Sequence, residues 1–396
     1  MVGLLSFDVL VVGRGLLASA AARHLATKNP HVALIGPTEE QNLRSKKVFA
    51  SHYDDTRVQR IIAQDELWTR LNLDSARAWL DLQEETSIDF YQQNGCLYVN
   101  TYEDSYLKRA PRIAKDFDLR FQSFKGAADV KEISPKLSIT GDIFGIYESA
   151  FAGQINPRKL ITAQLKAFAD HGGTEINDLV IEVSKAKGGW AIKAHSGQSY
   201  FAKQVLVAAG AFTNFSNLIP RPLKFENKSE VVIMGRLSKE DYLQMRNMPS
   251  LLFEIDVEEF EGIYLTAPAQ ASDGGYTLKM GMNQKSDLNL NDQDAMDEWF
   301  SGDRYKSFAP NLERELRKLF PTVTFLGTEL KRCVISRTFT ENPYIGEIDS
   351  GLYVAHGCNG YSAMSSDAQG KQAAALMSTG KFGEGYKESD FVLVYR

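Results

Sequence analysis

The sequence predicts a mixed α/β fold, with a Rossmann-like dinucleotide-binding domain and a smaller α+β domain built on an antiparallel sheet. The first observation is an apolar run at residues 7–12 that ends in a glycine-rich turn and leads directly into helical spacing. The second is another apolar run at residues 31–35, which completes a strand–turn–helix–strand unit. The third is a change of character between about residues 220 and 320, where short apolar segments are typical of antiparallel strands.

The glycine-rich turn, residues 13–18, reads Gly-Arg-Gly-Leu-Leu-Ala and matches the pattern Gly-x-Gly-x-x-Ala. Gly13 permits the tight turn, Gly15 lets the backbone approach a pyrophosphate, and Ala18 is small enough for the helix to pack on the strand. The helix N-terminus offers unpaired N–H groups and a favourable dipole to an anion. We therefore expect Gly13, Gly15, Leu16 and Leu17 to bind the cofactor. The alternative is a glycine-rich turn without a ligand.

The second strand ends without the acidic residue that usually binds the adenosine ribose. Ile35 is followed by Gly36, and the nearest residues that could serve are Thr38 and Glu39. The ribose contact is therefore the one part of the dinucleotide pattern that the sequence does not supply.

Composition excludes several classes of function. The chain has 396 residues, enough for two or three domains, and a net charge of -5, which argues against a nucleic-acid partner. No apolar run reaches the ~18 residues of a membrane span, and residues 1–6 lack the basic start of a signal peptide. Three scattered cysteines predict neither a disulfide framework nor a zinc site. We expect a cytoplasmic protein without a metal.

Further along the chain, Asp54 or Asp55 is expected to cap a helix after a polar loop at residues 38–48. Helical spacing predicts longer helices at about residues 63–85 and 158–171. A stretch at 291–319 is mostly helical, with a break expected near Pro310.

Two further segments are candidates for contact with a ligand. A buried strand at residues 204–212 ends in small residues, among them Ala209 and Gly210, where a ligand can come close. A second glycine-rich turn at 357–360 precedes a helix at about 366–377 and offers another anion contact.

The order of these elements predicts two domains that are each assembled from separate segments. The dinucleotide-binding domain takes residues 1–90, 151–218 and 321–396. The substrate domain takes residues 91–150 and 219–320.

Several of these segments together resemble the sarcosine oxidase (N-methyl amino acid oxidase) branch of the FAD-dependent D-amino-acid-oxidase (DAO) family, along nearly the whole chain. The turn at 13–18 is similar to the family's FAD fingerprint. Residues 51–57, Ser-His-Tyr-Asp-Asp-Thr-Arg, resemble Ser-His-His-Gly-Asp-Thr-Arg. Residues 208–212, Ala-Ala-Gly-Ala-Phe, resemble Ala-Ala-Gly-Ala-Trp, and 278–281, Leu-Lys-Met-Gly, resemble Leu-Lys-Leu-Gly. Cys333 precedes Gly346 by the thirteen residues that separate the family's flavin-carrying cysteine from the matching glycine.

The resemblance implies an FAD-binding domain of the glutathione-reductase type. It also implies which residues lie against FAD in addition to those of the first turn. These are Ser51, His52, Arg57, Ala209, Gly210, Cys333, Gly357, Asn359, Gly360, Tyr361 and Met364.

Lys279 is the first candidate catalytic residue. Residues 276–283 alternate, so Leu278 and Met280 face one side of a strand and Lys279 faces the other. Alternation alone favours a lysine on the wet face of an antiparallel sheet. The resemblance implies instead that Lys279 lies over the flavin, where a cation stabilises superoxide as it forms from oxygen. That role implies an oxidase rather than a dehydrogenase.

Cys333 lies in an apolar segment, where a cysteine is usually a small buried hydrophobic residue. Lys331 and Arg332 would favour the thiolate if they approached the sulfur. The resemblance implies that Cys333 carries FAD through a covalent bond to the 8α-methyl carbon. Cys358 is a poorer candidate, and Cys96 is expected to be structural.

Arg57 and Tyr53 complete the candidate catalytic set. A guanidinium matches the shape of a substrate carboxylate, so Arg57 is a candidate for binding one. The alternative is a surface arginine that is paired with Asp54 or solvated. Tyr53 stands where the family has its second histidine, which excludes a histidine base at that position. His52 is more often a packed residue than a base.

Two departures from the family's pattern concern the substrate. Met364 stands where the family has a carboxylate-binding lysine, and Asn283 stands where it has a histidine. A small N-methyl amino acid is therefore not the expected substrate. Tyr361, Met364 and Tyr264 would suit a larger or more apolar amine if they line the pocket, and they are equally compatible with core positions.

These observations predict an FAD-dependent oxidoreductase that oxidises the C–N bond of an amine or amino acid to an imine. A secondary or N-substituted small-molecule amine is favoured, with molecular oxygen reduced to hydrogen peroxide. One alternative is a flavin dehydrogenase that passes electrons to another acceptor. The other is a flavoprotein partner subunit that acts on a protein-bound amine.

Overall fold

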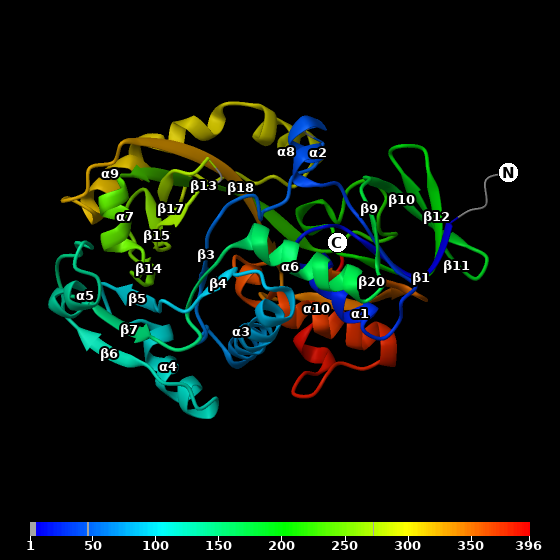
Figure 1. Cartoon of the computed structure of the whole chain (residues 1–396), viewed down its shortest axis with the longest axis horizontal. Helices are drawn as coiled ribbons and strands as arrows, with labels where there is room; N and C mark the ends of the chain where they lie inside the picture. Colours follow the sequence, from blue (N-terminus) through cyan, green and yellow to red (C-terminus); the bar gives the residue numbers. More distant parts are fainter. Residues whose placement is uncertain (1–4, 46, 272) are drawn as a thin grey trace.

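Two large sheets at opposite ends of an elongated molecule organise the chain (Figure 1). The computed structural model describes residues 5–45, 47–271 and 273–396. The mixed α/β fold predicted from the sequence is confirmed. The prediction that residues 1–6 lack the basic start of a signal peptide falls mainly on residues 1–4, which lie outside the described residues.

The first sheet holds the predicted dinucleotide unit and is mostly parallel. Within the described residues its main order is β10-β11-β12-β1-β2-β9, and β20 joins it at β12 and carries β19. β1 pairs in parallel with β2 and with β12, so the turn after β1 opens at the carboxyl edge of the sheet. The strands are β1 (Leu5–Val12), β2 (Val32–Ile35), β9 (Thr174–Ile176), β10 (Val180–Ala186), β11 (Gly189–Ala194), β12 (Ser199–Val207), β19 (Tyr344–Asp349) and β20 (Leu352–His356).

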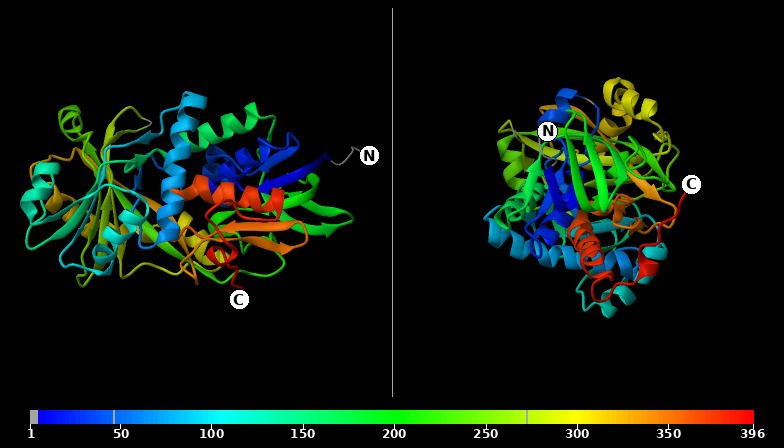
Figure 2. Two further views of the ribbon diagram at one scale, coloured as in Figure 1. Left: turned by 90° about the horizontal axis from the view of Figure 1, so that it is seen from below. Right: turned by 90° about the vertical axis from the view of Figure 1, so that its right-hand side faces the viewer.

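Helices cover one face of this sheet, as Figure 2 shows. They are α1 (Leu16–Ala26), α3 (Glu66–Thr86), α6 (Pro157–Asp170) and α10 (Ser362–Thr379). α1 lies directly on the strands because its inner face consists of small residues such as Ala18, Ala21 and Ala22. Buried carboxylate Asp367 of α10 accepts hydrogen bonds from Arg23 and His24 of α1 and from Gln164 of α6. Three helices are thereby joined around one charge.

The second sheet is mostly antiparallel and carries the main hydrophobic core on one face. Its order is β18-β13-β17-β15-β14-β5-β7-β6, with β16 at β17. The predicted alternation holds in β17, since Leu278, Met280 and Met282 enter the core while Lys279 faces the other way. The strands are β5 (Cys96–Asn100), β6 (Gln122–Lys125), β7 (Phe144–Glu148), β13 (Phe225–Leu237), β14 (Ser250–Glu254), β15 (Phe260–Leu265), β16 (Ala269–Gln270), β17 (Tyr276–Gln284) and β18 (Gly327–Thr338).

Shorter helices flank the second sheet. They are α4 (Ser105–Asp116), α5 (Ala127–Ile133), α7 (Lys239–Met245), α8 (Gln293–Ser301) and α9 (Ala309–Leu319). The helical stretch expected at 291–319 is broken as predicted: α8 ends at Ser301, a 3₁₀ turn follows (Arg304–Phe308), and Pro310 stands in the first turn of α9. Proline is tolerated there because that position has no intrahelical N–H bond to lose.

A small third sheet lies between the two large ones. It consists of β3 (Arg57–Gln59), β8 (Gly153–Ile155) and β4 (Tyr91–Gln92), in the order β3-β8-β4. The prediction of a helix after Asp54 or Asp55 is wrong, because residues 57–59 form strand β3 and pair with β8 instead. The polar loop expected at 38–48 contains a short helix, α2 (Glu39–Ser45).

β18 lies in a different sheet from the one that the predicted domain ranges imply. Its residues fall within 321–396, yet it pairs with β13 along almost its whole length and so belongs to the second sheet. The remaining ranges stay a prediction. Across the part of the chain that the structure describes, every helix is too short or too polar to cross a membrane.

Candidate active site

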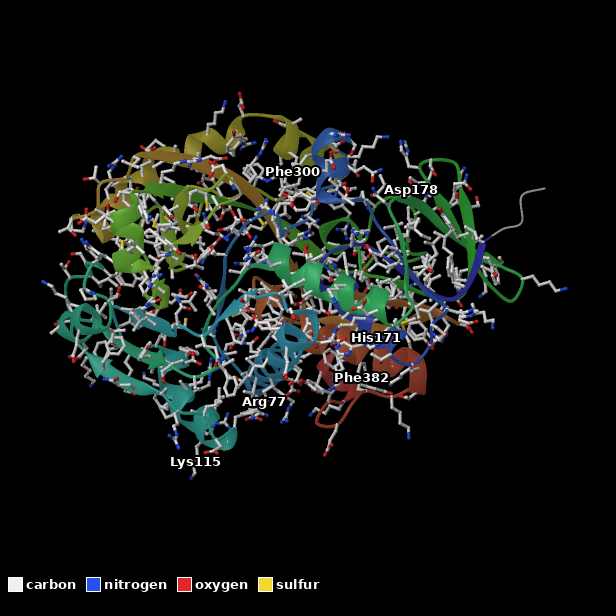
Figure 3. All side chains as sticks on the ribbon, viewed as in Figure 1. Arg77, Lys115, His171, Asp178, Phe300 and Phe382 are labelled. Atoms are coloured by element: carbon white, nitrogen blue, oxygen red, sulfur yellow. The ribbon has the colours of Figure 1, made fainter. Side chains whose placement is uncertain are left out.

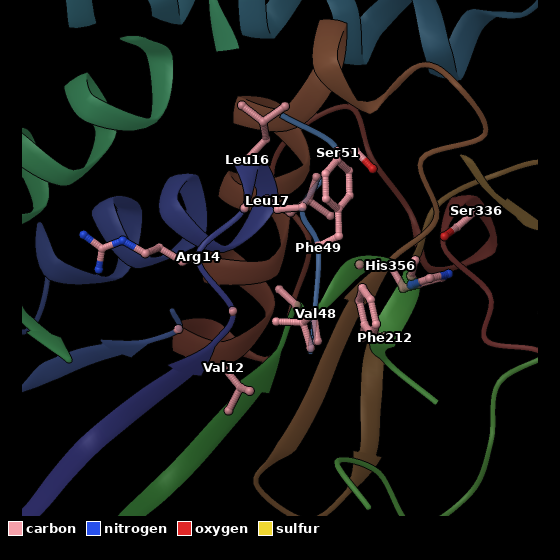
Figure 4. Close-up of a pocket in the computed structure, with 18 of the residues that line it drawn as sticks. Val12, Arg14, Leu16, Leu17, Val48, Phe49, Ser51, Phe212, Ser336 and His356 are labelled. Atoms are coloured by element: carbon pink, nitrogen blue, oxygen red, sulfur yellow. The ribbon is translucent and has the colours of Figure 1, made fainter. Parts of the chain in front are cut away.

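A deep cavity opens where β1, β12 and β20 end and α1 begins (Figure 4). It encloses about 1220 Å³ of space, including its open mouth. The wall combines the turn after β1, the residues after β12 and the segment that follows α2. Val48, Phe49 and Phe212 point into the cavity, whereas Arg14 points away from it toward Glu175.

The first turn has the shape that a pyrophosphate needs. Gly13 has φ +124°, and a Cβ added to it would lie 2.3 Å from the carbonyl oxygen of Ala208. Gly15 faces open space, with no heavy atom within 4 Å of an added Cβ. α1 begins at Leu16 without a side-chain cap on its Gly15 N-cap. The N–H groups at the start of α1 are therefore available to an anion.

The two candidates for the missing ribose contact, Thr38 and Glu39, do not line the cavity. At the end of β2 the wall is formed by Gly36 and Pro37. Glu39 binds Arg158 through both of its oxygens, at 2.8 and 2.6 Å. Because Arg158 occupies both oxygens of Glu39, other groups would have to contact the adenosine ribose.

An aromatic contact closes the cavity on the side of the second sheet. Phe49, in the segment after α2, stacks on Phe300 of α8 with ring centroids 4.2 Å apart. Figure 3 labels Phe300 beside α2. Ser51 follows and donates a hydrogen bond of 3.0 Å to the carbonyl oxygen of Val334 on β18. Segment 48–52 thus lines the same cavity as the turn after β1 and is hydrogen-bonded to β18, the strand that carries Cys333.

Next to this segment lies a polar cluster formed by buried Asp54 and Lys279 and by the partly buried Arg57. The Arg57 guanidinium donates to Asp54 Oδ1 at 3.0 Å and to the Ser51 carbonyl oxygen. The Lys279 ammonium donates to Asp54 Oδ2 and, at 2.8 Å, to the Thr56 carbonyl oxygen. Lys279 is only 1% exposed, so the wet-face alternative for this lysine is excluded.

Burial and charge act against each other in this cluster. Burial lowers the pKa of Lys279 to about 8, and Arg57 lowers it too, while Asp54 raises it. For Asp54, burial works to raise the pKa, but Arg57 and Lys279 outweigh it and hold the pKa below its ordinary value. The cluster therefore carries two cations and one anion, and its net charge is positive at neutral pH.

Cys333 lies at the edge of this cluster. Its sulfur is 3.7 Å from the Arg57 guanidinium, and its own carbonyl oxygen accepts a hydrogen bond from Trp299. The neighbouring cation is therefore Arg57 rather than Arg332, whose guanidinium binds the carbonyl oxygens of Trp299 and Gly302.

Two further polar residues share this face of the second sheet. Glu230 of β13 pairs directly with Cys333 across the strands, and its Oε1 accepts a 2.9 Å hydrogen bond from the Tyr264 hydroxyl. Its other oxygen, Oε2, is buried without a hydrogen-bond partner among the described atoms. Burial raises the pKa of Glu230 to about 7. Tyr264 lies over Gly281, where a Cβ would be 2.1 Å from the ring.

Arg60 is a second buried cation, three residues beyond Arg57. Its guanidinium lies over the rings of three tyrosines, Tyr98, Tyr106 and Tyr361, at 6.0, 5.1 and 5.5 Å from their centroids. Within the described residues it makes no ion pair, and its Nε has no hydrogen-bond partner. Its backbone N–H donates to the sulfur of Met364. Arg60 therefore lies beside the two residues, Tyr361 and Met364, that the sequence placed near the flavin.

The predicted site residues fall into three groups in space. Gly13, Gly15, Leu16, Leu17, Ser51, His52, Ala209, Gly210 and Gly357 line the large cavity. Arg57, Lys279 and Cys333 form the adjoining cluster, and Tyr361 and Met364 contact Arg60. Asn359 instead holds the end of β18 through Thr338, and Gly360 gives the turn its positive φ of +83°. The roles of all these residues stay predictions.

Tyr53 lies apart from the polar cluster. Its hydroxyl accepts a hydrogen bond of 2.5 Å from Asn42 of α2, and its ring packs against Phe49 and His52. Asp54, Arg60 and Glu230 are the site residues that sequence reasoning missed. The helix expected after Asp54 or Asp55 hid the first two, and Glu230 had no motif around it.

The cavity and its rim have the donor set for a flavin dinucleotide. The cradle at Gly13 and Gly15 suits a pyrophosphate, the apolar wall suits planar rings, and the Arg57–Lys279 cluster supplies positive charge at one end. FAD would be held by the first turn, by segment 48–52 and by the turn at 357–360.

Comparison with known proteins agrees with this assignment. Monomeric sarcosine oxidase of Bacillus sp. (strain NS-129) is 23% identical over 399 residues, which cover 95% of this chain and 94% of that protein. The NikD Tyr258Phe mutant, described as an unusual amino acid oxidase essential for nikkomycin biosynthesis, has a TM-score of 0.79 at 18% identity and 99% and 98% coverage. Glycine oxidase from Geobacillus kaustophilus has a TM-score of 0.73 at 18% identity, with 98% and 99% coverage.

A family model described as "FAD dependent oxidoreductase" matches residues 8–376, which is most of the chain. The matched range contains the turn at Gly13, the cluster around Lys279 and most of the helix that follows the turn at 357–360. The resemblance predicted from the sequence is thereby confirmed, and the chain belongs to the DAO family of FAD-dependent oxidoreductases.

Proposed function

We propose that this protein oxidises the C–N bond of an amine or amino acid that carries a carboxylate, with a secondary or N-substituted amine as the favoured substrate. Bound FAD would supply the two-electron acceptor for the hydride from the carbon beside the amine nitrogen. The nitrogen would lose a proton to give the imine, and oxygen would take up the two electrons and two protons as hydrogen peroxide. The names of the sarcosine oxidases and glycine oxidase support this reaction class. The chain's own residues suggest how the substrate is held.

The observation that carries the proposal is the unpaired charge of Arg60. A buried guanidinium without an anionic partner is costly, and a ligand carboxylate that supplies the missing charge binds it strongly. The three tyrosine rings stabilise Arg60 through cation–π contacts and hold it in place while the site is empty.

Arg57 is less suited to bind the substrate than the sequence suggested. Its Nε and Nη2 donors are taken by Asp54, by the Ser51 carbonyl oxygen and by the Cys333 sulfur. We assign Arg57 to the flavin side of the site, where its guanidinium lies beside the Cys333 sulfur. Covalent attachment of FAD through Cys333 is part of this proposal.

Lys279 is proposed to act on oxygen. Its ammonium is preorganised by Asp54 and by the Thr56 carbonyl oxygen, so it does not have to reorient when negative charge forms on oxygen. A cation fixed in a dry site stabilises such charge far more than one in water.

The test is anaerobic reduction of the purified flavoprotein, monitored by the long-wavelength flavin band. A panel would contain N-methyl amino acids, cyclic imino acids, D- and L-amino acids and matched amines without a carboxylate. We expect bleaching by a carboxylate-bearing amine, with full recovery and peroxide formation in air. Bleaching that air does not reverse would support the dehydrogenase alternative. Absence of bleaching with every member, alongside a stable complex with another protein, would support the partner-subunit alternative.

A further inference from the structure

Lys279 is held by a carboxylate that comes from a distant part of the chain. Its ammonium donates hydrogen bonds to Asp54 and to the Thr56 carbonyl oxygen, both from the segment that precedes β3. Asp54 is 4% exposed and Lys279 1% exposed. A cation buried to this extent is stable only when a counter-ion and hydrogen bonds replace its water shell.

The charged groups around the ammonium come from a few elements. Arg57 of β3 is a like charge, Asp54 is the anion, and Cys333 of β18 is nearby. Glu230 of β13 and Tyr264 of β15 are polar groups on the same face of the sheet, but Glu230 is hydrogen-bonded to Tyr264 rather than to Lys279. Among the groups described around Lys279, Asp54 is therefore its direct ionic partner.

The balance of these effects makes the charge of Lys279 depend on Asp54. Burial lowers the pKa of Lys279 to about 8, and Arg57 pushes it down as well. Asp54 is the main group that opposes both effects, through its charge and its hydrogen bond, and Cys333 adds a smaller contribution in the same direction. If its charge were removed, two cations would face each other without an anion between them, and the lysine would release its proton at a lower pH.

We propose that Asp54 is a positioning residue for oxygen reduction, whose carboxylate keeps Lys279 protonated and fixes its ammonium on the face of the sheet that carries Cys333. This rests on the proposed role of Lys279 toward oxygen. Asp54 acts through Lys279 and does not itself touch oxygen. The Asp54 carboxylate also accepts a hydrogen bond from Arg57, so it lies between the two cations and keeps them apart.

The decisive variant is Asp54→Asn, which keeps the size of the side chain and removes its charge. The matched control is Asp55→Asn, the same change one residue later. Asp55 is buried to a similar degree but binds Arg158 and not Lys279. Asp54→Ser is a second neutral variant for the case in which the asparagine variant fails to fold.

Two measurements are made on each holoprotein between pH 6 and 10. One is the titration of Lys279 by NMR of protein labelled with ¹⁵N at the lysine Nζ, with the signal assigned by its loss in Lys279→Met. The other is the second-order rate constant for reaction of the photoreduced flavoprotein with oxygen. We expect Asp54→Asn to move the lysine titration to lower pH by more than one unit and to slow the oxygen reaction at pH 7.5 by about fivefold to tenfold, because fewer molecules carry the charge. Asp55→Asn should change neither.

An unchanged titration and an unchanged oxygen rate in the neutral Asp54 variants would overturn the proposal. So would an equal change in Asp55→Asn, since that would make the effect a general loss of negative charge. Failure of the proposed function looks different. In that case Lys279→Met itself would leave the oxygen rate at the level of the unmodified protein, whatever the Asp54 variants did to the titration.

Discussion

Gly13 and Ala208 approach so closely that the turn between β1 and α1 can be built only without a side chain. A Cβ on Gly13 would lie 2.3 Å from the Ala208 carbonyl oxygen, and Gly13 has a φ of +124°. Ala208 in turn donates its N–H to the carbonyl oxygen of Val12 at 2.8 Å. The cofactor turn is therefore locked to the end of β12, which also forms part of the cavity wall.

This relationship predicts different effects on stability for two glycines of the same motif. Gly13→Ala should destabilise the protein by about 2–4 kcal/mol and reduce FAD content, because it combines backbone strain with a clash against a fixed carbonyl group. Gly15→Ala should leave the apoprotein's melting temperature within a few degrees, since nothing lies within 4 Å of its Cβ. It should still weaken FAD binding, because the added methyl group faces the pyrophosphate. Thermal unfolding with and without FAD checks both, and normal FAD affinity in Gly13→Ala would contradict the assignment.

Arg60 should decide whether the substrate's carboxylate is recognised. Arg60→Gln is expected to lower kcat/KM for a carboxylate-bearing amine by about 100-fold or more, since a buried charge-assisted pair contributes about 2–5 kcal/mol. The matched amine without a carboxylate should lose little. Arg112→Gln is the control, because Arg112 is an exposed arginine with surface ion pairs only. An equal loss for both amines would show that Arg60 supports the fold rather than the substrate.

Cys333 should carry the flavin. After acid denaturation of the unmodified protein, flavin fluorescence is expected to stay with the polypeptide on a denaturing gel, whereas Cys333→Ser should release all of it. Cys358→Ser serves as the comparison, because Cys358 lies in the cavity wall itself but has no cation at hydrogen-bond distance from its sulfur in the described contacts. Release of the flavin from the unmodified protein would exclude the covalent bond.

The elements with strong local signals could be predicted from the sequence. The turn at Gly13 is recognisable because each of its glycines meets a specific structural requirement between a strand and a helix. The direction of Lys279 followed from alternation in β17, since a strand must place successive side chains on opposite faces. Its burial could not be predicted, because the covering residue, Asp54, lies 225 positions away in the chain.

The remaining differences arise where tertiary pairing overrides a local signal. Asp54 and Asp55 are good helix caps by type, but residues 57–59 gain more from pairing with β8 than from a helix turn. The apolar segment around Cys333 in β18 is compatible with a strand in either domain. Only the pairing of β18 with β13 determines the sheet to which it belongs. Arg60 carries no signal of its own, because three distant tyrosines define its surroundings.

The buried carboxylate of Asp367 should control acid stability of the helical layer. It accepts hydrogen bonds from Arg23 at 2.7 Å, His24 at 2.9 Å and Gln164 at 2.7 Å. Burial works to raise the pKa of Asp367, but His24 and Arg23 outweigh it and hold the pKa well below its ordinary value. A depressed pKa means that the carboxylate stabilises the fold above about pH 4, and that this stabilisation is lost as the pH falls toward the folded-state value.

Asp367→Asn is therefore expected to lower the free energy of unfolding by about 3–5 kcal/mol at pH 7, because it leaves Arg23 buried without its anion. The difference from the unmodified protein should shrink as the pH is lowered from 5 to 3, where Asp367 itself becomes protonated in the unfolded chain. Urea unfolding at several pH values measures both effects. Asp170→Asn, which removes an exposed i,i+4 pair with Lys166 on α6, should change stability by less than about 1 kcal/mol. If the Asp367→Asn difference were the same at every pH, the loss would come from packing and not from the charge that joins α1, α6 and α10.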